Sequence, residues 1–421
     1  MTSNLFTVYE ESIKRAERVY TSLLNEIENS ENIYVGGINA IGESEFLCRI
    51  YPSLTFVDDY QAGSKFLDRE VISTNEMAKR IRSSDFLINN CLTPNGFNHF
   101  FRQAESLSIP SCNVVEALAP HYKNGMVMDF HGLNSVYGPA FHDHTFRNIE
   151  KYYKIREYLK DKFSLRTFDN LINYRLTGNP NLLHSVAVGH NFGSIRHDSY
   201  ILNSQFFTLS DKEIFIDAGA LDGASSQFFV ESVNGNFEKI IMFEPFPESV
   251  KKCQETKEKI DAQFPGKSIK EKIEIAEFGL YSYEGNLDLA QSLFSTEVTE
   301  KHGELPQSAH IIETGLSSAF VEDGDQYKII KVPTTTLDSY LGDDPVTFIK
   351  FEIEGSEVPA LEGATKTIKK NKPKMALSIY HRPQDLEMII DYVKDLQVGY
   401  NFALRAHNPY CPDAIVLYCW V

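Results

Sequence analysis

A glycine-containing turn follows an apolar strand in the second half of the sequence. The strand Ile214–Ile216 leads into Asp217, Gly219 and Gly223. Glycines allow a tight turn and a close approach of the backbone to a ligand. The helix that follows offers free N–H groups to a carboxylate or a polar adenosyl group. Asp217, at the strand tip, can accept a hydrogen bond from a ligand's ammonium group, which has no counterpart in the pyrophosphate of a dinucleotide.

Two further strands end in residues that suit a nucleoside. Glu244 follows the strand Ile240–Phe243 and can hold two ribose hydroxyls with one carboxylate. It stands 25 residues after Gly219, slightly more than the roughly 20 of a nucleotide-binding unit. The third strand ends near Phe278, which can line an adenine. Because the carboxyl ends of parallel strands converge, we predict one cofactor site. Its residues are Asp217, Gly219, Ala220, Gly223, Glu244, Pro245, Phe278 and Gly279.

Alternating strands and helices position these residues on one sheet. The pattern predicts a mainly parallel sheet that is closed by a terminal antiparallel hairpin. The polar, poorly periodic stretch 292–325 is expected to form an excursion or a mobile flap. The expected strands are 214–216, 240–243, 273–277, 347–352, 374–379, 400–406 and 414–420, and the expected helices are 225–231, 249–260, 358–369 and 384–396.

The first part of the chain has a similar rhythm. We expect strands at 33–35, 54–57, 86–88 and near Val114–Val115, with helices ending near Cys48 and covering 75–82 and 97–107. This alternation predicts a smaller Rossmann-like α/β domain. Residues 131–144 are interpreted as loop, including a solvated His142-Asp-His144 segment, and helices are expected over 145–161 and from Ser164. We therefore divide the chain into an N-terminal domain (1–125), a helical connector (126–199) and a C-terminal domain (200–421).

The N-terminal domain carries an incomplete dinucleotide motif. Gly37 and Gly42 occupy glycine positions of G-x-G-x-x-G, and Asp58 and Asp59 follow at about the expected distance. The middle position is Asn39, whose side chain obstructs close approach to a pyrophosphate. We therefore favour a Rossmann-like domain without a bound dinucleotide, which helps to select substrate, binds a sugar nucleotide or mediates assembly.

Composition excludes several classes of partner. The 421-residue chain has a formal net charge of −17, which argues against nucleic acid and anionic membranes as partners. No apolar run approaches the roughly 20 residues that span a bilayer, and the N-terminus lacks the features of a signal peptide. The six cysteines contain no CxxC pair, a pattern typical of reduced thiols. We expect a cytoplasmic protein, and a homo-oligomer is compatible with the sequence.

The C-terminal half resembles the FkbM family of methyltransferases, within the class I Rossmann-like superfamily. The resemblance covers about residues 195–421. It implies S-adenosylmethionine as cofactor, a seven-stranded sheet, and methyl transfer to a hydroxyl of a sugar, a glycan or a related metabolite. Its motifs are Phe215-Ile-Asp-Ala-Gly-Ala with Gly223, Phe243-Glu-Pro245, Thr336-Leu-Asp338, Phe348-Ile-Lys-Phe-Glu-Ile-Glu-Gly355-Ser-Glu357, Leu361-Glu-Gly363-Ala364 and Ser378-Ile-Tyr-His381. The family usually shows Lys-x-Asp-x-Glu-Gly, whereas this chain has Glu352 at the first acid.

The expected reaction needs a held donor, an aligned acceptor oxygen and a base for the hydroxyl proton. His381 is the first candidate for the base because an imidazole titrates near neutral pH. Glu352 is the second candidate, and Lys350 follows. A histidine satisfied by backbone and a lysine paired with a carboxylate are the competing interpretations. Asp338, Glu352 and His381 offer hard metal ligands, but we expect no metal because carboxylates near a sulfonium have other uses.

Two other functions stay open. The domain can be a non-catalytic module that binds S-adenosylmethionine, which the Glu352 departure and the extra N-terminal domain motivate. The less favoured alternative is an NAD-dependent oxidoreductase that uses the N-terminal domain.

Overall fold

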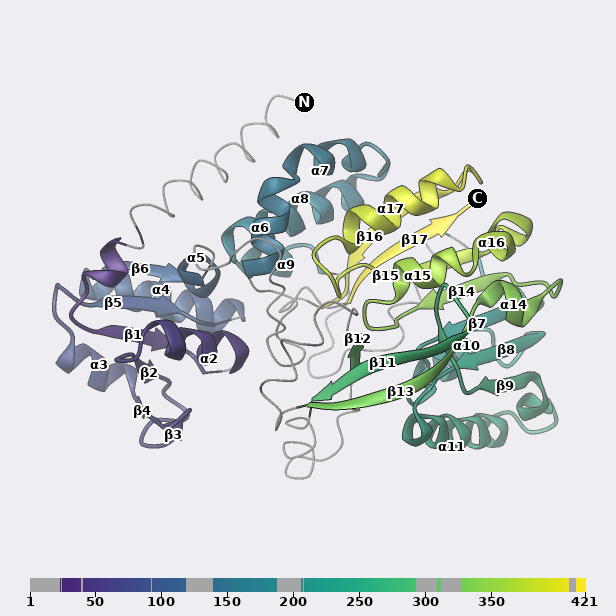
Figure 1. Cartoon of the computed structure of the whole chain (residues 1–421), viewed down its shortest axis with the longest axis horizontal. Helices are drawn as coiled ribbons and strands as arrows, with labels where there is room; N and C mark the ends of the chain where they lie inside the picture. The colour runs from purple at the N-terminus through teal and green to yellow at the C-terminus, as the bar shows by residue number, and fades with distance from the viewer. Residues whose placement is uncertain are drawn as a thin grey trace. The chain divides into compact units, whose positions relative to one another are not determined.

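The computed structural model forms two compact units, which are coloured along the chain in Figure 1. The first comprises Met1–Tyr153, Arg166–Val188 and Asn408–Asp413, and the second comprises Lys154–Leu165, Gly189–His407 and Ala414–Val421. The structure describes residues 23, 25–38, 41–91, 93–118, 139–187, 206, 208–292, 309–311, 327–408 and 414–421. Within these ranges, every helix is too short or too polar to cross a bilayer.

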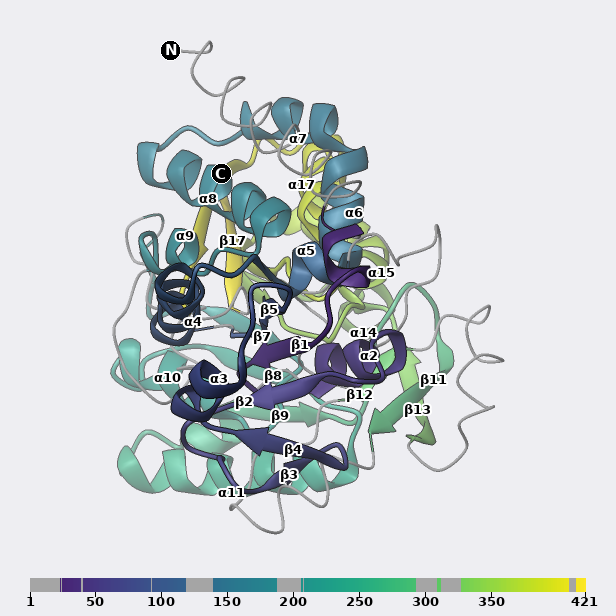
Figure 2. The same cartoon turned by 90° about the vertical axis from the view of Figure 1, so that its left-hand side faces the viewer.

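The first unit contains a six-stranded sheet with the order β3-β4-β2-β1-β5-β6, and Figure 2 shows its strands β1, β2, β3 and β4 toward the viewer. Five strands are parallel and the short β3 is antiparallel to β4. The sheet confirms the predicted smaller Rossmann-like domain, although the β3–β4 pair was not anticipated. The strands are β1 Ile33–Gly36, β2 Thr55–Val57, β3 Lys65–Phe66, β4 Arg69–Ile72, β5 Phe86–Asn89 and β6 Ser111–Asn113.

The helices of this part differ from expectation at two places. The strand expected near Val114–Val115 is present as β6, but it ends at Asn113, and Val114 and Val115 begin α5. Asn113 Oδ1 accepts from the Glu116 N–H at 2.9 Å, and Glu116 Oε2 accepts from the Asn113 N–H at 3.1 Å. This reciprocal cap starts a helix in spite of two β-branched residues. The helices are α2 Ile41–Ile50, α3 Thr74–Arg80, α4 Pro94–Leu107, α5 Val114–Leu118, α6 Pro139–Arg147, α7 Ile149–Arg156, α8 Lys162–Thr177 and α9 Asn181–His184.

The second difference concerns the segment 131–144. Its end, from Pro139, lies in α6, so the loop interpretation is wrong there, and 131–138 lie outside the described residues. His142 is buried, and burial lowers its pKa to about 4. Its imidazole is therefore neutral at physiological pH and belongs to the interior of the unit, where a solvated segment was expected.

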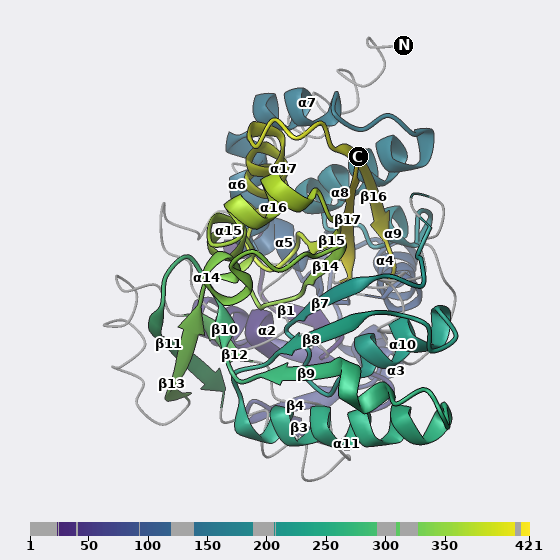
Figure 3. The ribbon, with the colours of Figure 1, turned by 90° about the vertical axis from the view of Figure 1, so that its right-hand side faces the viewer.

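The second unit contains a seven-stranded sheet with the order β16-β17-β15-β14-β7-β8-β9 (Figure 3). All strands run parallel except β17, which is antiparallel to both of its neighbours. The predicted sheet and its terminal hairpin are confirmed. The strands are β7 Ile214–Ala218, β8 Lys239–Phe243, β9 Ile273–Ala276, β14 Phe348–Phe351, β15 Lys374–Ser378, β16 Asn401–Ala406 and β17 Ile415–Trp420.

Helices cover this sheet. Phe229 of α10 and Cys253 of α11 join a buried cluster with Phe215 and Phe348 of the strands. The helix expected over 358–369 is interrupted at Gly363, where a Cβ would lie 2.1 Å from the carbonyl oxygen of Tyr281. The helices are α10 Ala224–Ser232, α11 Pro247–Gln263, the 3-10 helix η4 Ile269–Lys272, α14 Leu337–Leu341, α15 Glu357–Glu362, α16 Thr365–Asn371 and α17 Asp385–Asp395.

A smaller sheet with the order β10-β13-β11-β12 accompanies the large one. Its strands are β10 Gly279–Leu280, β11 Gly285–Ser292, β12 Ala309–Ile311 and β13 Tyr327–Thr335. The antiparallel ribbon of β11 and β13 was not predicted. The stretch expected as an excursion or flap, 292–325, is described only at Ser292 and at β12, and its remainder lies outside the described residues.

Candidate active site

The turn after β7 is a backbone shape that requires glycine. Gly219 has φ +76, and a Cβ there would lie 1.8 Å from the carbonyl oxygen of Glu352. Gly223, with φ +79, precedes the first turn of α10, and Leu221 between them has φ 56. A non-glycine residue in this conformation is strained, and such strain concentrates at functional sites. The turn therefore combines a backbone packed tightly against the end of β14 with a helix N-terminus.

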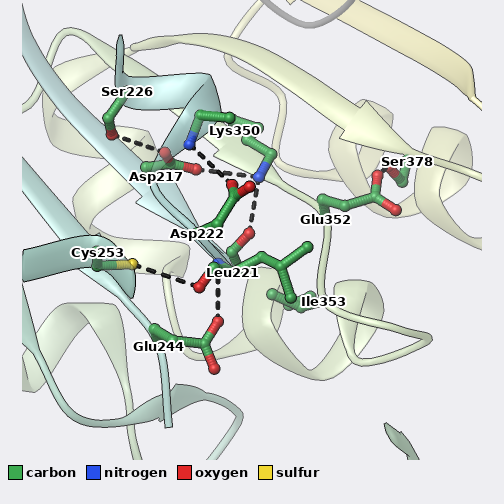
Figure 4. A network of polar contacts seen from close by, with 12 residues as sticks. Asp217, Leu221, Asp222, Ser226, Glu244, Cys253, Lys350, Glu352, Ile353 and Ser378 are labelled. Atoms are coloured by element: carbon green, nitrogen blue, oxygen red, sulfur yellow. Dashed lines mark hydrogen bonds and ion pairs between the residues drawn. The ribbon is translucent and has the colours of Figure 1, made fainter. Parts of the chain in front are cut away.

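A buried ion pair between Lys350 and Asp217 holds this turn in place (Figure 4). Lys350 Nζ lies 3.0 Å from Asp217 Oδ1 and donates to the Gly219 carbonyl oxygen at 2.9 Å. Ser226 Oγ donates to Asp217 Oδ2 at 2.7 Å. We expected Asp217 to meet a ligand's ammonium group. Its carboxylate is instead fully buried, with both oxygens bonded inside the protein, so in this arrangement it positions the turn without direct access to a ligand.

Glu244 lies beside the same turn, at the end of β8. Its Oε2 accepts from the Leu221 N–H at 2.9 Å, and its Oε1 accepts from the Phe246 N–H at 3.0 Å. Burial raises the pKa of this carboxyl to about 7, against the lowering effect of the two N–H groups and of Lys350. Each carboxylate oxygen keeps a second lone pair. The side chain can therefore accept two further hydrogen bonds without losing its place.

Aromatic residues and small residues gather at the neighbouring strand ends. A Cβ on Gly279 would lie 3.8 Å from Pro245, so these two predicted residues are neighbours. Phe278 is 37% exposed, and its ring lies 6.4 Å from that of Tyr340. Tyr340 also packs edge-on against Phe243 at 4.8 Å. The sequence interpretation missed Tyr340, because it lies on α14, beyond the polar stretch and far from the other site residues in the chain.

Glu352 and His381 meet at the ends of β14 and β15. His381 Nε2 lies 3.2 Å from Glu352 Oε1 and 3.7 Å from Glu354 Oε2. Tyr380 donates to Glu352 Oε1 at 2.5 Å, and Ser378 donates to Oε2. The sequence interpretation assigned no role to Ser378 and Tyr380, although both belong to the motif that ends at His381. Glu352 is thus an acceptor that three donors hold in place.

These contacts shift the pKa values of His381 and Glu352 in opposite directions. Burial alone would lower the pKa of His381, but the charges of Glu357 and Glu352 raise it well above its usual value. Burial would raise the pKa of Glu352, but His381, Lys350 and the Ser378 hydroxyl lower it to about 2. At neutral pH the imidazole is therefore protonated and the carboxylate ionised. In this state His381 cannot take a proton from a substrate.

Two other sets of candidates have structural partners. Asp338 accepts from the backbone N–H groups of Lys366 and Thr367, at 3.0 and 2.8 Å. It caps α16 and does not join Glu352 and His381. In the first unit, Asp58 accepts from backbone N–H groups two and three residues ahead, and Asp59 accepts from Thr74. Asn39 lies outside the described residues.

The strand order, the glycine turn and the acidic strand ends together define a Rossmann-like α/β domain with a ligand site at the carboxyl ends of its strands. Residues 217–402 match the family model of the methyltransferase FkbM domain. Residues 217–402 therefore form a methyltransferase FkbM domain, and the protein is a methyltransferase.

A solved structure shares this fold. The methyltransferase FkbM from Methylobacillus flagellatus KT is 21% identical, with 99% of this chain and 100% of that chain covered at a TM-score of 0.72. A putative rRNA methylase from Clostridium thermocellum is 11% identical and covers 53% of this chain and 90% of its own, at a TM-score of 0.29. A putative methyltransferase from Streptococcus mutans, in complex with SAH, is 13% identical and covers 53% and 94%, also at 0.29. No curated protein matches the chain.

Proposed function

We propose that this enzyme transfers the methyl group of S-adenosylmethionine to a hydroxyl oxygen of a sugar, a glycan or a related small metabolite. The observation that carries the proposal is the position of Glu244 beside the glycine turn. One carboxylate, fixed by two backbone N–H groups, faces a strained loop that ends in a helix N-terminus. This combination suits a ribose and the polar end of a cofactor.

Each predicted cofactor residue has a part in this proposal. Glu244 accepts from the two ribose hydroxyls, and the backbone of Gly219, Ala220 and Gly223 approaches the amino-acid end of the cofactor. Pro245, Phe278 and Gly279 line the adenine, and Tyr340 adds an aromatic ring at the same edge. Asp217 and Lys350 act as positioning residues, because they pair with each other and Lys350 also donates to the Gly219 carbonyl oxygen of the turn.

Because of Glu244, we expect cofactor binding to depend on pH. Its pKa of about 7 lies above that of an exposed carboxyl, so it is protonated below pH 7 and ionised above. Only the ionised form accepts from both ribose hydroxyls. S-adenosylhomocysteine should therefore bind roughly tenfold more tightly at pH 8 than at pH 6, from the change in ionised fraction. Isothermal titration at the two pH values measures this ratio.

Glu244→Gln is the control for this prediction. The amide does not titrate, so the variant should bind more weakly at pH 8 and lose the dependence on pH. Equal affinity of the wild-type protein at both pH values would show that Glu244 does not titrate at the cofactor.

On the acceptor side, we propose that Glu352 accepts a hydrogen bond from the hydroxyl to be methylated. It is the partly exposed member of the three catalytic candidates, whereas the side chains of His381 and Lys350 are 5% and 3% exposed. His381 and Lys350 hold the carboxylate and the turn in place. The surplus of acidic groups around Glu352 suits a neutral, hydroxylated acceptor better than an anion.

The test is a methyl-transfer assay with labelled S-adenosylmethionine and a panel of monosaccharides, oligosaccharides and hydroxylated small molecules. Label on an oxygen of one acceptor class supports the proposal. Binding of S-adenosylhomocysteine without turnover on any acceptor would instead favour a non-catalytic module.

Two further assignments belong to this proposal. We propose residues 200–421 as the catalytic domain, 1–125 as a domain that selects the acceptor or mediates assembly, and 126–199 as a helical connector. We also propose a cytoplasmic location, in keeping with the five described cysteines, which are all free thiols.

A further inference from the structure

Two buried polar atoms next to the proposed catalytic residues have no hydrogen-bond partner. In the described part of the chain, Glu357 Oε2 and His381 Nδ1 are among six such side-chain atoms. The side chains are 0% and 5% exposed, so water from outside does not reach them freely. Buried polar atoms are nearly always satisfied, and neighbouring exceptions point to an ion or a water that completes them.

The two atoms belong to one cluster with a third side chain. His381 Nδ1 lies 3.0 Å from Glu357 Oε1, in an ion-pair contact outside hydrogen-bond alignment. Asp385, at the start of α17, is 2% exposed and accepts from the Arg382 N–H at 2.6 Å. The ligand atoms of Glu357, His381 and Asp385 all lie within 4.8 Å of one another. Two carboxylates and one imidazole thus converge on a small interior volume.

The cluster also brings three carboxylates close together. Glu352, Glu357 and Asp385 surround the imidazole of His381, and Lys350 and Arg382 add positive charge nearby. Buried like charges are costly unless cations compensate them. The carboxylates of Glu357 and Asp385 lie close enough to repel each other when both are ionised.

We propose that Glu357, His381 and Asp385 bind a divalent transition-metal cation, with Nδ1 as the imidazole ligand. A mixed set of nitrogen and carboxylate oxygen suits Zn²⁺ better than Mg²⁺ or Ca²⁺. The cation satisfies both orphaned atoms and cancels the repulsion between the acids. Binding displaces the proton on Nδ1, while Nε2–H keeps its contact with Glu352.

This arrangement gives the ion a function at the reaction site without contact with substrate. A metal-bound histidine commonly donates its other N–H to a carboxylate, which fixes the ring and the acid together. Here that acid is Glu352, 3.2 Å from Nε2. The ion, with water as its remaining ligand, thereby orients Glu352 through His381. The proposal does not depend on the identity of the methyl acceptor.

The experiment measures Zn²⁺ binding to the full chain after removal of metal with a chelator. Competition with a chromophoric zinc chelator should reveal one tight site per wild-type chain. Asp385→Asn and Glu357→Gln should each weaken that site at least tenfold, because each removes a charged ligand. Asp395→Asn, on the exposed end of the same helix, should leave it unchanged. Zn²⁺ should also raise the thermal midpoint of the wild-type protein more than that of the two ligand variants.

Several outcomes overturn the proposal. The absence of a tight zinc site in the wild-type protein overturns it. This result needs no variant, so it holds even if a ligand variant fails to fold. Unchanged zinc affinity in Asp385→Asn overturns the proposal as well. A loss on Glu354→Gln without a loss on Asp385→Asn would move the ion to Glu352, Glu354 and His381 Nε2, the other cluster of possible ligands.

Discussion

Gly219→Ala is expected to abolish binding of S-adenosylhomocysteine. The new Cβ would lie 1.8 Å from the Glu352 carbonyl oxygen, in a backbone conformation of φ +76. No rotation of a side chain relieves this contact, because both partners are backbone. The ends of β7 and β14 must therefore separate, which displaces the Leu221 N–H from Glu244. We expect affinity to fall by about 100-fold or more, equivalent to about 2.7 kcal/mol.

A second glycine provides the matched control. Gly266 has φ +84, but a Cβ there would meet nothing within 4 Å. Gly266→Ala therefore introduces the same kind of backbone strain without the clash and outside the proposed site. It should lower the thermal midpoint slightly and leave the affinity for S-adenosylhomocysteine as in the wild-type protein. Wild-type affinity in Gly219→Ala would place the cofactor elsewhere.

Glu352→Gln is expected to lower kcat by about 10²–10³-fold. The variant loses the carboxylate that accepts a hydrogen bond from the substrate hydroxyl. The carboxylate accepts from Ser378, Tyr380 and His381. An amide replaces one accepting oxygen with a donor, so it breaks one of these contacts and repels the hydroxyl hydrogen. Steady-state kinetics on an acceptor found in the panel measures the loss.

The controls for Glu352 separate chemistry from folding. S-adenosylhomocysteine should bind Glu352→Gln within a few-fold of the wild-type protein, because this side chain lies on the acceptor side. Glu362→Gln, on the exposed side of α15, should keep full kcat. Wild-type kcat in Glu352→Gln would show that Glu352 has no part in the reaction. Another side chain would then have to accept the hydrogen bond from the substrate hydroxyl.

The large sheet could be predicted because its signals are local. The central strands of the seven-stranded sheet are short apolar runs, and the acids and glycines of the proposed site lie at or just after their ends. The convergence of these ends on one edge then follows from the parallel topology. Glu244 and Gly219 could be assigned to one site for that reason, although 25 residues separate them.

Other features depend on contacts that a single sequence does not reveal. The Lys350–Asp217 pair joins residues 133 positions apart. This contact explains why two charged side chains can both be buried. We predicted His381 as the catalytic base, yet the neighbouring Glu357 and Glu352 keep its imidazole protonated. Val114 shows the opposite case. Its β-branched side chain favours a continued strand, but β6 ends at Asn113, where a reciprocal cap with Glu116 starts α5.

The most direct test of the central claim is a calorimetric titration of the full chain with S-adenosylhomocysteine, with NAD in a parallel titration. The account predicts one binding site per chain for S-adenosylhomocysteine, which Gly219→Ala eliminates, and no heat of binding for NAD. Binding of NAD without any binding of S-adenosylhomocysteine would contradict the account and point to the N-terminal domain as the cofactor site.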